Sequence, residues 1–213
     1  PPRAPRRGPP PPNLPNACGQ ISQMPQIWRG FGIEAAVVWR GVDHNRSEFY
    51  WEAPDGSQVL AVYLPYGYAN AAALPLDQNF PQALRQVVEQ MDAWNTTLST
   101  LLLHGFDYMP PQAKLPQALA QARRVLGDEV ELVHGTLADY VRSVQEMSPA
   151  LATLSGEFRS HRRAPLLPGT LSSRLWIKQR NDQLQNLLER WAEPFNAWAA
   201  SLGAPPASAP LWL

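Results

Sequence analysis

"EFYWEAPDGSQVLAVYLPY", residues 48–66, joins two runs of aromatic and aliphatic residues through Pro54-Asp55-Gly56. Pro-Asp-Gly between two β-prone runs is typical of a turn, because proline presets φ, aspartate bonds its own backbone and glycine accepts positive φ. The stretch therefore predicts a β-hairpin. Upstream of it, "EAAVVW" (34–39) predicts a buried strand, and "ISQMPQIWRGFG" (21–32) predicts a short helix closed by glycine.

Downstream of the hairpin, helical and extended patterns alternate. Apolar residues at helical spacing predict three helices, over 81–95, 115–127 and 136–147. Two short apolar runs that end in His-Gly, "STLLLHG" (99–105) and "EVELVHG" (129–135), predict strands between them. This alternation predicts an α/β fold, a partial βα-barrel-like domain with largely parallel strands.

The two ends of the chain differ from its middle. Residues 1–12 contain seven prolines, three arginines, one alanine and one glycine, which predicts a disordered tail. After Met147 the chain is rich in Pro, Ser and Arg without a period, and we expect a long connection. Residues 171–203 then predict one long amphipathic helix. Its apolar stripe has no predicted partner, so we expect self-association through this helix and interpret the end at Leu213 as a truncation.

Composition excludes several classes of protein. The 213 residues allow one substantial core and the start of a second. Lys and Arg number 18 and Asp and Glu number 18, so neither nucleic acid nor a membrane surface is an expected partner. One cysteine excludes an internal disulfide framework, and no apolar run is long enough to cross a membrane. With no recognisable signal peptide, we expect a cytoplasmic location.

In a parallel sheet, ligands bind at the carboxyl ends of the strands, and four residues with useful chemistry lie there. Asp107 is flanked by aromatic residues that would favour a neutral general acid, although it could simply cap the turn before two prolines. Arg40 could clamp a substrate or form a structural ion pair. Tyr66 and Tyr68 could bind a ligand or only pack, and the eight tryptophans could stack on sugars or only fill the core.

Four strings occur in one order: "ISQMPQIWRGFGIEAAVVWRGV", "SEFYWEAPDGSQVLAVYLPYGY", "HGFDYMPPQ" and "GTLSSRLWIKQRNDQLQNLLERWAEP". Together they resemble the glycoside hydrolase family 38 α-mannosidases, particularly the bacterial branch. The resemblance runs from about Leu14 to Ser201. It implies a partial catalytic domain over 13–167 and the start of a helical middle domain over 168–213, where a helical bundle begins.

The resemblance also implies a chemistry. Members of the family hydrolyse terminal α-mannosyl bonds of glycans with retention, using a nucleophilic Asp, a second carboxyl as acid/base and a zinc ion that grips the sugar. By resemblance, Asp107 takes the general acid/base position. Arg40 and Tyr68 take substrate-binding positions, with Tyr66 beside them. The implied partner is a mannose-containing oligosaccharide.

One loop departs from the family pattern. In the family, the nucleophile loop has the sequence pattern P-D-(small)-F-G-H, and this chain has "PNACGQ" over 15–20. Asn16 therefore stands where the nucleophilic, zinc-binding aspartate belongs, and Gln20 where a histidine belongs. An amide neither attacks an anomeric carbon as a carboxylate does nor supplies the anion that zinc prefers. The upstream H-x-D pair is absent and the last histidine ligand would lie past Leu213, so we expect no intact zinc site and inefficient hydrolysis.

Three hypotheses follow. The first is a fragment of an α-mannosidase, arising from a partial or misread gene. The second is a non-catalytic carbohydrate-binding pseudoenzyme that retains Arg40, Tyr66, Tyr68 and Asp107. The third is an interaction module that acts through the proline-rich tail and the long helix.

Overall fold

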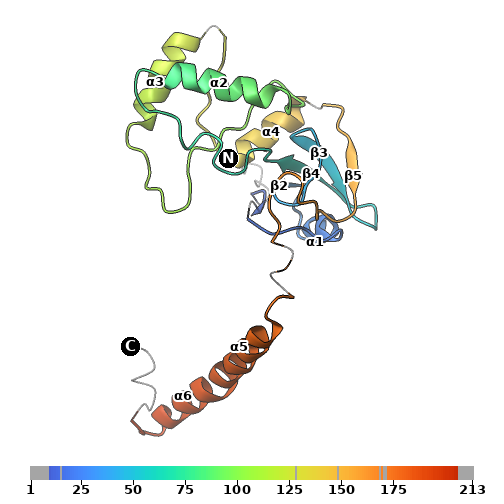
Figure 1. Cartoon of the computed structure of the whole chain (residues 1–213), viewed down its shortest axis with the longest axis vertical. Helices are drawn as coiled ribbons and strands as arrows, with labels where there is room; N and C mark the ends of the chain where they lie inside the picture. The colour runs from blue at the N-terminus through green and yellow to red at the C-terminus, as the bar shows by residue number, and fades with distance from the viewer. Residues whose placement is uncertain are drawn as a thin grey trace, which may run out of the picture. The chain divides into compact units, whose positions relative to one another are not determined.

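The computed structural model describes residues 10–14, 16–127, 129–147, 149–167, 169 and 172–205. The chain divides into two compact units, Pro1–Leu166 and Leu167–Leu213. Each unit is described by itself (Figure 1).

A five-stranded sheet with the strand order β1-β2-β4-β3-β5 forms the centre of the first unit (Figure 1). Its strands are β1 (Asn13–Leu14), β2 (Ala35–Val38), β3 (Glu48–Glu52), β4 (Gln58–Tyr63) and β5 (Thr153–Ser155). Three of the four strand pairs are parallel, and only β3 and β4 run antiparallel. The α/β fold with a mixed, mostly parallel sheet confirms the predicted fold class, whereas barrel closure and a helical bundle stay predictions.

The predicted hairpin is formed by β3 and β4. Gly56 has a φ of +83°, and its N–H donates to the carbonyl of Ala53 across 2.9 Å. The Asp55 carboxylate accepts the N–H and the hydroxyl of Ser57 at 3.0 and 2.9 Å. The turn therefore forms for the reason that the sequence indicates, because aspartate and glycine supply its local hydrogen bonds and its positive φ.

Helices cover both faces of this sheet. On one face, Trp28 of α1 (Met24–Gly30) packs into a cluster with Val38 of β2 and Trp51 of β3. On the other face, Val141 and Val144 of α4 (Leu137–Met147) join a second cluster built on alternate residues of β2 and β4. Since successive residues of a strand point to opposite faces, β2 and β4 each supply both clusters.

Two further helices, α2 (Phe80–Asp92) and α3 (Leu115–Leu126), form a separate pair (Figure 1). Phe80 and Leu84 of α2 pack against Ala118, Ala122 and Leu126 of α3. The small alanine side chains allow the two helices to approach closely. The helices predicted over 81–95, 115–127 and 136–147 are thus all confirmed.

The strands predicted over 99–105 and 129–135 are wrong, because both segments are irregular. In the first segment, the side chain of Asn70 takes the place of a neighbouring strand. Its Nδ2 donates to the Leu101 carbonyl at 3.0 Å, and its Oδ1 accepts the Leu103 N–H at 2.8 Å. In the second segment, the Leu132 carbonyl accepts Nε of Arg123 at 3.0 Å. These side chains bond to backbone groups that a strand ladder would otherwise use.

Two predictions about irregular segments need correction. Within the tail predicted over 1–12, residues 1–9 lie outside the described part of the chain. Its last residue is ordered, since the Pro12 carbonyl accepts the Val37 N–H at 2.9 Å. The connection predicted after Met147 contains β5, which pairs in parallel with β3 and extends the sheet.

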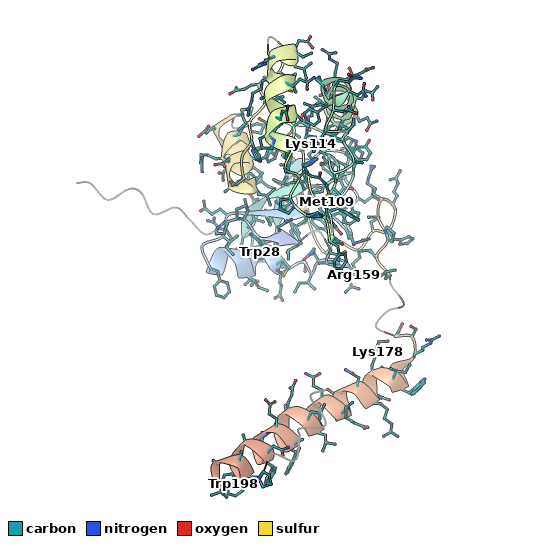
Figure 2. The ribbon with its side chains drawn as sticks, turned by 90° about the vertical axis from the view of Figure 1, so that its left-hand side faces the viewer. Trp28, Met109, Lys114, Arg159, Lys178 and Trp198 are labelled. Carbon is teal, nitrogen blue, oxygen red and sulfur yellow. The ribbon has the colours of Figure 1, made fainter. Side chains whose placement is uncertain are left out.

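The second unit contains a continuous helical rod that confirms the long helix predicted there. It consists of α5 (Leu175–Leu187), a π-helical turn η2 (Leu188–Ala192) and α6 (Glu193–Ser201). Pro194 lacks the N–H that would close an α-helical turn, which accounts for the wider turn before it. None of these elements has a buried residue, and Figure 2 shows their side chains extending outward between the labelled Lys178 and Trp198.

Candidate functional site

Two of the predicted site residues meet directly. The hydroxyl of Tyr68, in the loop after β4, donates to Oδ2 of Asp107 across 2.9 Å. This hydrogen bond, followed by desolvation and by the charge of Asp107, raises the pKa of Tyr68, while the charge of Arg40 opposes the shift. Tyr68 is therefore held as a neutral donor to the carboxylate.

Aromatic rings fix the position of Tyr68. The ring of Trp39 meets it edge to face, with centroids 5.5 Å apart. The ring of Phe106 stacks on it, with centroids 5.9 Å apart. Gly67 lies against Trp39, and a Cβ there would come within 3.1 Å of the indole. The close approach and the φ of +77° at this position both require glycine.

Arg40 reaches the same group of residues. Its guanidinium lies over the ring of Trp39, 4.1 Å from the centroid, and Nη1 donates to the Pro165 carbonyl at 2.8 Å. Its Nε is buried and has no hydrogen-bond partner among the described residues. The structural ion pair considered from the sequence is absent from this described part of the chain. One buried N–H of the guanidinium is therefore left without a hydrogen-bond partner among the described residues.

Asp107 is more open than the sequence predicts. It lies in a turn closed by the Met109 N–H and the Phe106 carbonyl at 3.0 Å, and its side chain is exposed. The expected aromatic enclosure is wrong for the described residues, because Phe106 stacks on Tyr68 and Tyr108 is itself fully exposed. The carboxylate accepts from Tyr68, so it does not act only as a turn cap.

The loop with the unusual amides lies beside β1. Asn16 is exposed, and the Cys18 thiol contacts its backbone carbonyl at 3.9 Å. Gln20 is buried, 7% exposed, and its backbone pairs with Phe158. Among the described residues, no hydrogen bond joins Asn16 to Asp107 or Tyr68, so the two predicted halves of the site are not bonded directly.

The donor set does not fit the zinc ion that the family resemblance implies. Among the described residues, no group of three His, Cys, Asp or Glu side chains lies close enough to hold a metal ion. Asn16 offers only an amide, and His104 uses Nδ1 to contact the Ala71 carbonyl at 2.8 Å. His134 and His161 are exposed.

Tyr66 belongs to a neighbouring aromatic group. It is 54% exposed, and its ring meets that of Trp94 at 6.2 Å. The guanidinium of Arg163 covers the Trp94 ring at 4.7 Å. Tyr66 is therefore accessible to a ligand, and its ring contact is with Trp94 rather than with Asp107.

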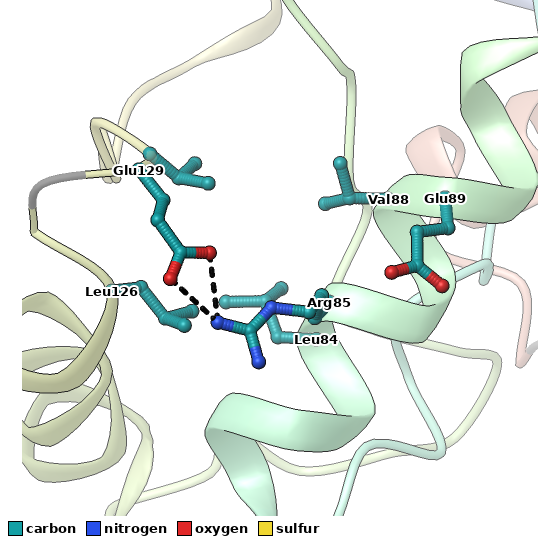
Figure 3. Close-up of a pocket in the computed structure, with 7 residues that line it drawn as sticks. Leu84, Arg85, Val88, Glu89, Leu126 and Glu129 are labelled. Atoms are coloured by element: carbon teal, nitrogen blue, oxygen red, sulfur yellow. Dashed lines mark hydrogen bonds and ion pairs between the residues drawn. The ribbon is translucent and has the colours of Figure 1, made fainter.

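A pocket also opens away from these residues, between α2 and the end of α3 (Figure 3). It is lined by Leu84, Arg85, Val88, Glu89, Leu126, Glu129 and Val130. Arg85 spans it through an ion pair with Glu129, which Figure 3 shows as two dashed lines to one nitrogen. None of the predicted site residues lines this pocket, so we do not assign the site to it.

Sequence reasoning missed three participants: Trp39, Phe106 and Pro165. Trp39 follows the buried strand β2, so its place at a strand end could have identified it, whereas Phe106 follows a segment that forms no strand. Pro165 could not be found from local pattern, because its carbonyl reaches Arg40 across 125 positions of the sequence.

Comparison with known proteins identifies related sequences and structures. Residues 13–164 match the family model described as "Glycosyl hydrolases family 38 N-terminal domain". A relative from Halalkalibacterium halodurans, described as "Putative mannosylglycerate hydrolase", is 32% identical over 199 residues, with 85% of this chain and 22% of the relative covered. The chain thus spans about a fifth of that relative's length.

Two solved structures from Enterococcus faecalis are similar in fold. An α-mannosidase is 28% identical with a TM-score of 0.74, and the match covers 92% of this chain and 23% of that one. A protein in glycosyl hydrolase family 38 is 26% identical with a TM-score of 0.58, and the match covers 89% of this chain and 19% of that one.

Proposed function

The chain belongs to glycosyl hydrolase family 38, and from this premise we propose that it supplies part of an α-mannoside-binding site in a retaining glycosidase. Its partner would be a mannose-containing oligosaccharide. The observation that carries the proposal is the contact between Tyr68 and Asp107 beside Arg40 and Trp39.

Each of these residues has a role in the proposed site. Asp107 serves as general acid/base, because an exposed carboxylate at a loop is free to meet a glycosidic oxygen. Tyr68 orients that carboxylate and binds the sugar. Arg40 supplies a fixed positive charge that would bind a sugar hydroxyl or the nucleophile, and Tyr66 adds an exposed ring beside the sugar.

The residue in the nucleophile position limits what this chain can do. Asn16 is exposed, and an amide at that place cannot form the covalent glycosyl intermediate of a retaining enzyme. The poor fit of the donor set to zinc supports the same conclusion. We therefore propose that the chain as written binds mannosides but hydrolyses them inefficiently, and that it does not hold zinc.

Two origins are compatible with this proposal. The chain is either an incomplete piece of a zinc-dependent α-mannosidase or a carbohydrate-binding pseudoenzyme. The second is favoured by Asn16 and Gln20, because amides stand at the positions of both the family's acid and its histidine. The relative described as a mannosylglycerate hydrolase suggests a further candidate substrate, a mannosyl group on a small acidic aglycone.

One experiment distinguishes the two origins. Asn16→Asp and Gln20→His are introduced together into a polypeptide extended to the length of the relatives, and release of nitrophenol from p-nitrophenyl α-mannoside is followed with and without zinc. Zinc-dependent hydrolysis that disappears on adding Asp107→Asn would support the incomplete enzyme. No hydrolysis in the restored polypeptide would reject the enzyme and leave the binding protein.

The exposed helix of the second unit supports one further proposal. Leu184, Leu188, Trp191, Phe195 and Trp198 are all at least 45% exposed. Such an apolar surface favours association, so we propose that the purified chain forms dimers or larger species. A monodisperse monomer by light scattering would reject this.

The proposal involves neither nucleic acid nor a membrane surface. No helix in the described ranges is both long and apolar enough to cross a bilayer. The cytoplasmic location and the role of the proline-rich tail as a docking segment stay predictions of the sequence.

A further inference from the structure

A strap, residues 156–166, connects parts of the candidate site that are far apart in sequence. Its anchor is Phe158, which is 6% exposed and stacks on Trp51 with centroids 4.2 Å apart. The Gly156 carbonyl accepts the indole N–H of Trp51 at 3.0 Å. The strap is therefore fixed to the core cluster that lies under β3 and β4.

From this anchor the strap bonds to two loops. Phe158 exchanges two backbone hydrogen bonds with Gln20, at 2.9 and 3.0 Å, and Ser160 donates to the Gly41 carbonyl at 3.0 Å. Further along, the Pro165 carbonyl accepts Nη1 of Arg40 at 2.8 Å. The same short segment thus holds the loop of Asn16 and the arginine of the proposed sugar site.

Arg163 fastens the outer part of the strap. Its guanidinium lies 4.7 Å from the ring centroid of Trp94, and its Nε lies 3.5 Å from Oδ1 of Asp43. Its side chain is 28% exposed, against 74% for Arg162, which lies at the same distance from the same carboxylate. Trp94 in turn contacts Tyr66, so Arg163 links the strap to a third predicted site residue.

We propose that the strap is a positioning element of the sugar site and that Arg163, held between Asp43 and Trp94, is its positioning residue. Without this contact the outer part of the strap separates from Trp94, the Pro165 carbonyl no longer restrains Arg40, and the pairing of Phe158 with Gln20 loosens. The role in sugar binding rests on the proposed function, whereas the restraint of the two loops does not.

Hydrogen exchange of the full 213-residue chain, followed by mass spectrometry, tests the restraint. In Arg163→Met, peptides covering 16–20 and 39–43 should exchange about tenfold faster, the effect of losing one stacked and half-buried cation. Peptides from α2 and α3 should keep their wild-type rates. Arg163→Lys should restore most of the protection, because lysine keeps the charge near Asp43 and Trp94.

Arg162→Met is the matched control, since it removes a cation from the same carboxylate without uncovering Trp94. It should behave as the wild type. Unchanged exchange in the two loops of Arg163→Met, or an equal rise in every peptide, would overturn the proposal. If Arg163→Met does not fold, hydrogen exchange of Asp43→Asn and of Trp94→Leu is compared with that of the wild type instead. Each variant should exchange faster in the same two loops.

A parallel titration with methyl α-mannoside separates this proposal from the proposed function. Arg163→Met should bind the sugar several-fold more weakly than Arg162→Met. If the wild-type chain binds no sugar, the proposed function fails, and the exchange rates still decide whether the strap restrains the loops. If the sugar binds equally to both variants while the loops loosen in Arg163→Met, the positioning role is rejected.

Discussion

The hydroxyl of Tyr68 donates to the carboxylate of Asp107 across 2.9 Å, although the two residues are 39 positions apart. The contact joins the loop after β4 to the turn that follows the irregular 99–105 segment. Arg40 lies close enough for its charge to oppose the rise in the pKa of Tyr68. Three residues selected from the sequence are therefore close neighbours in the fold.

The first prediction concerns the titration of this tyrosine. Asp107→Asn should lower the pKa of Tyr68 toward its ordinary value, because the hydrogen bond to the carboxylate is the largest cause of its rise. Phenolate absorbance against pH measures the change, and Tyr68→Phe identifies which part of the curve belongs to this residue. An unchanged curve in Asp107→Asn would mean that the hydrogen bond is not formed in solution.

Glu48 provides a prediction about stability. This carboxylate is 1% exposed and accepts hydrogen bonds from the Tyr140 hydroxyl at 2.6 Å and from the N–H and hydroxyl of Thr96. Burial, and then the nearby carboxylate, raise the pKa of Tyr140, which keeps it a donor. Glu48→Ala should lower the free energy of unfolding by about 3 kcal/mol, because it leaves buried donors without an acceptor.

Urea denaturation followed by tryptophan fluorescence measures this loss. Glu52→Ala, on the same strand, is the control and should change the free energy of unfolding by about 0.5 kcal/mol or less, since its one hydrogen bond to Gln58 is at the surface. Equal effects of the two substitutions would contradict the buried network.

A pair of glycines tests the close approach of the strap to the sheet. A Cβ on Gly41 would lie 2.3 Å from the carbonyl oxygen of Phe158, whereas one on Gly56 would meet nothing within 4 Å. Both glycines have positive φ, at +94° and +83°. Gly56→Ala should therefore cost only the conformational term, about 1 kcal/mol, and Gly41→Ala should cost distinctly more. Similar melting temperatures for the two variants would show that the strap is not in place.

The cap of α4 predicts a dependence of stability on pH. Hydrogen bonds from the Thr136 hydroxyl and N–H, at 2.7 and 2.9 Å, lower the pKa of Asp139. A lowered folded-state pKa means that the stabilisation is present above the ordinary value near 3.8 and is lost as the pH falls through the folded-state pKa.

Asp139→Asn should therefore have a lower melting temperature than the wild type at neutral pH, and the difference should narrow in acid. Glu146, exposed on the same helix, provides the control. The melting temperature of Glu146→Gln should change with pH as that of the wild type does. A difference that is constant with pH would contradict the assigned cap.

Local chemistry explains which elements could be predicted. The hairpin around Asp55 and Gly56 and the cap of α4 by Thr136 and Asp139 depend on groups within three positions of one another, so the sequence contains the whole interaction. Helices α2, α3 and α4 follow from their apolar spacing.

Contacts between distant segments explain the errors. The 99–105 run has strand composition, but Asn70 occupies its hydrogen-bonding groups, and no periodicity reveals that. β5 and the strap lie in a stretch without hydrophobic periodicity, so the sequence does not reveal them. Their pairing with β3, Gln20 and Gly41 depends on tertiary contacts. Of the candidate site, Arg40 and Tyr68 could be anticipated from the ends of β2 and β4, whereas Asp107 follows an irregular segment and its exposure could not be anticipated.

The most direct test of the proposed function is a calorimetric titration of the chain with methyl α-mannoside, with methyl α-galactoside as the reference sugar. We predict saturable binding of the mannoside with a dissociation constant on the order of 1 mM, a weak affinity in keeping with an exposed, partial site. Tyr68→Phe should weaken it several-fold. Absence of mannoside binding, or equal binding of both sugars, would contradict the proposal that Arg40, Tyr68 and Asp107 form a mannoside site.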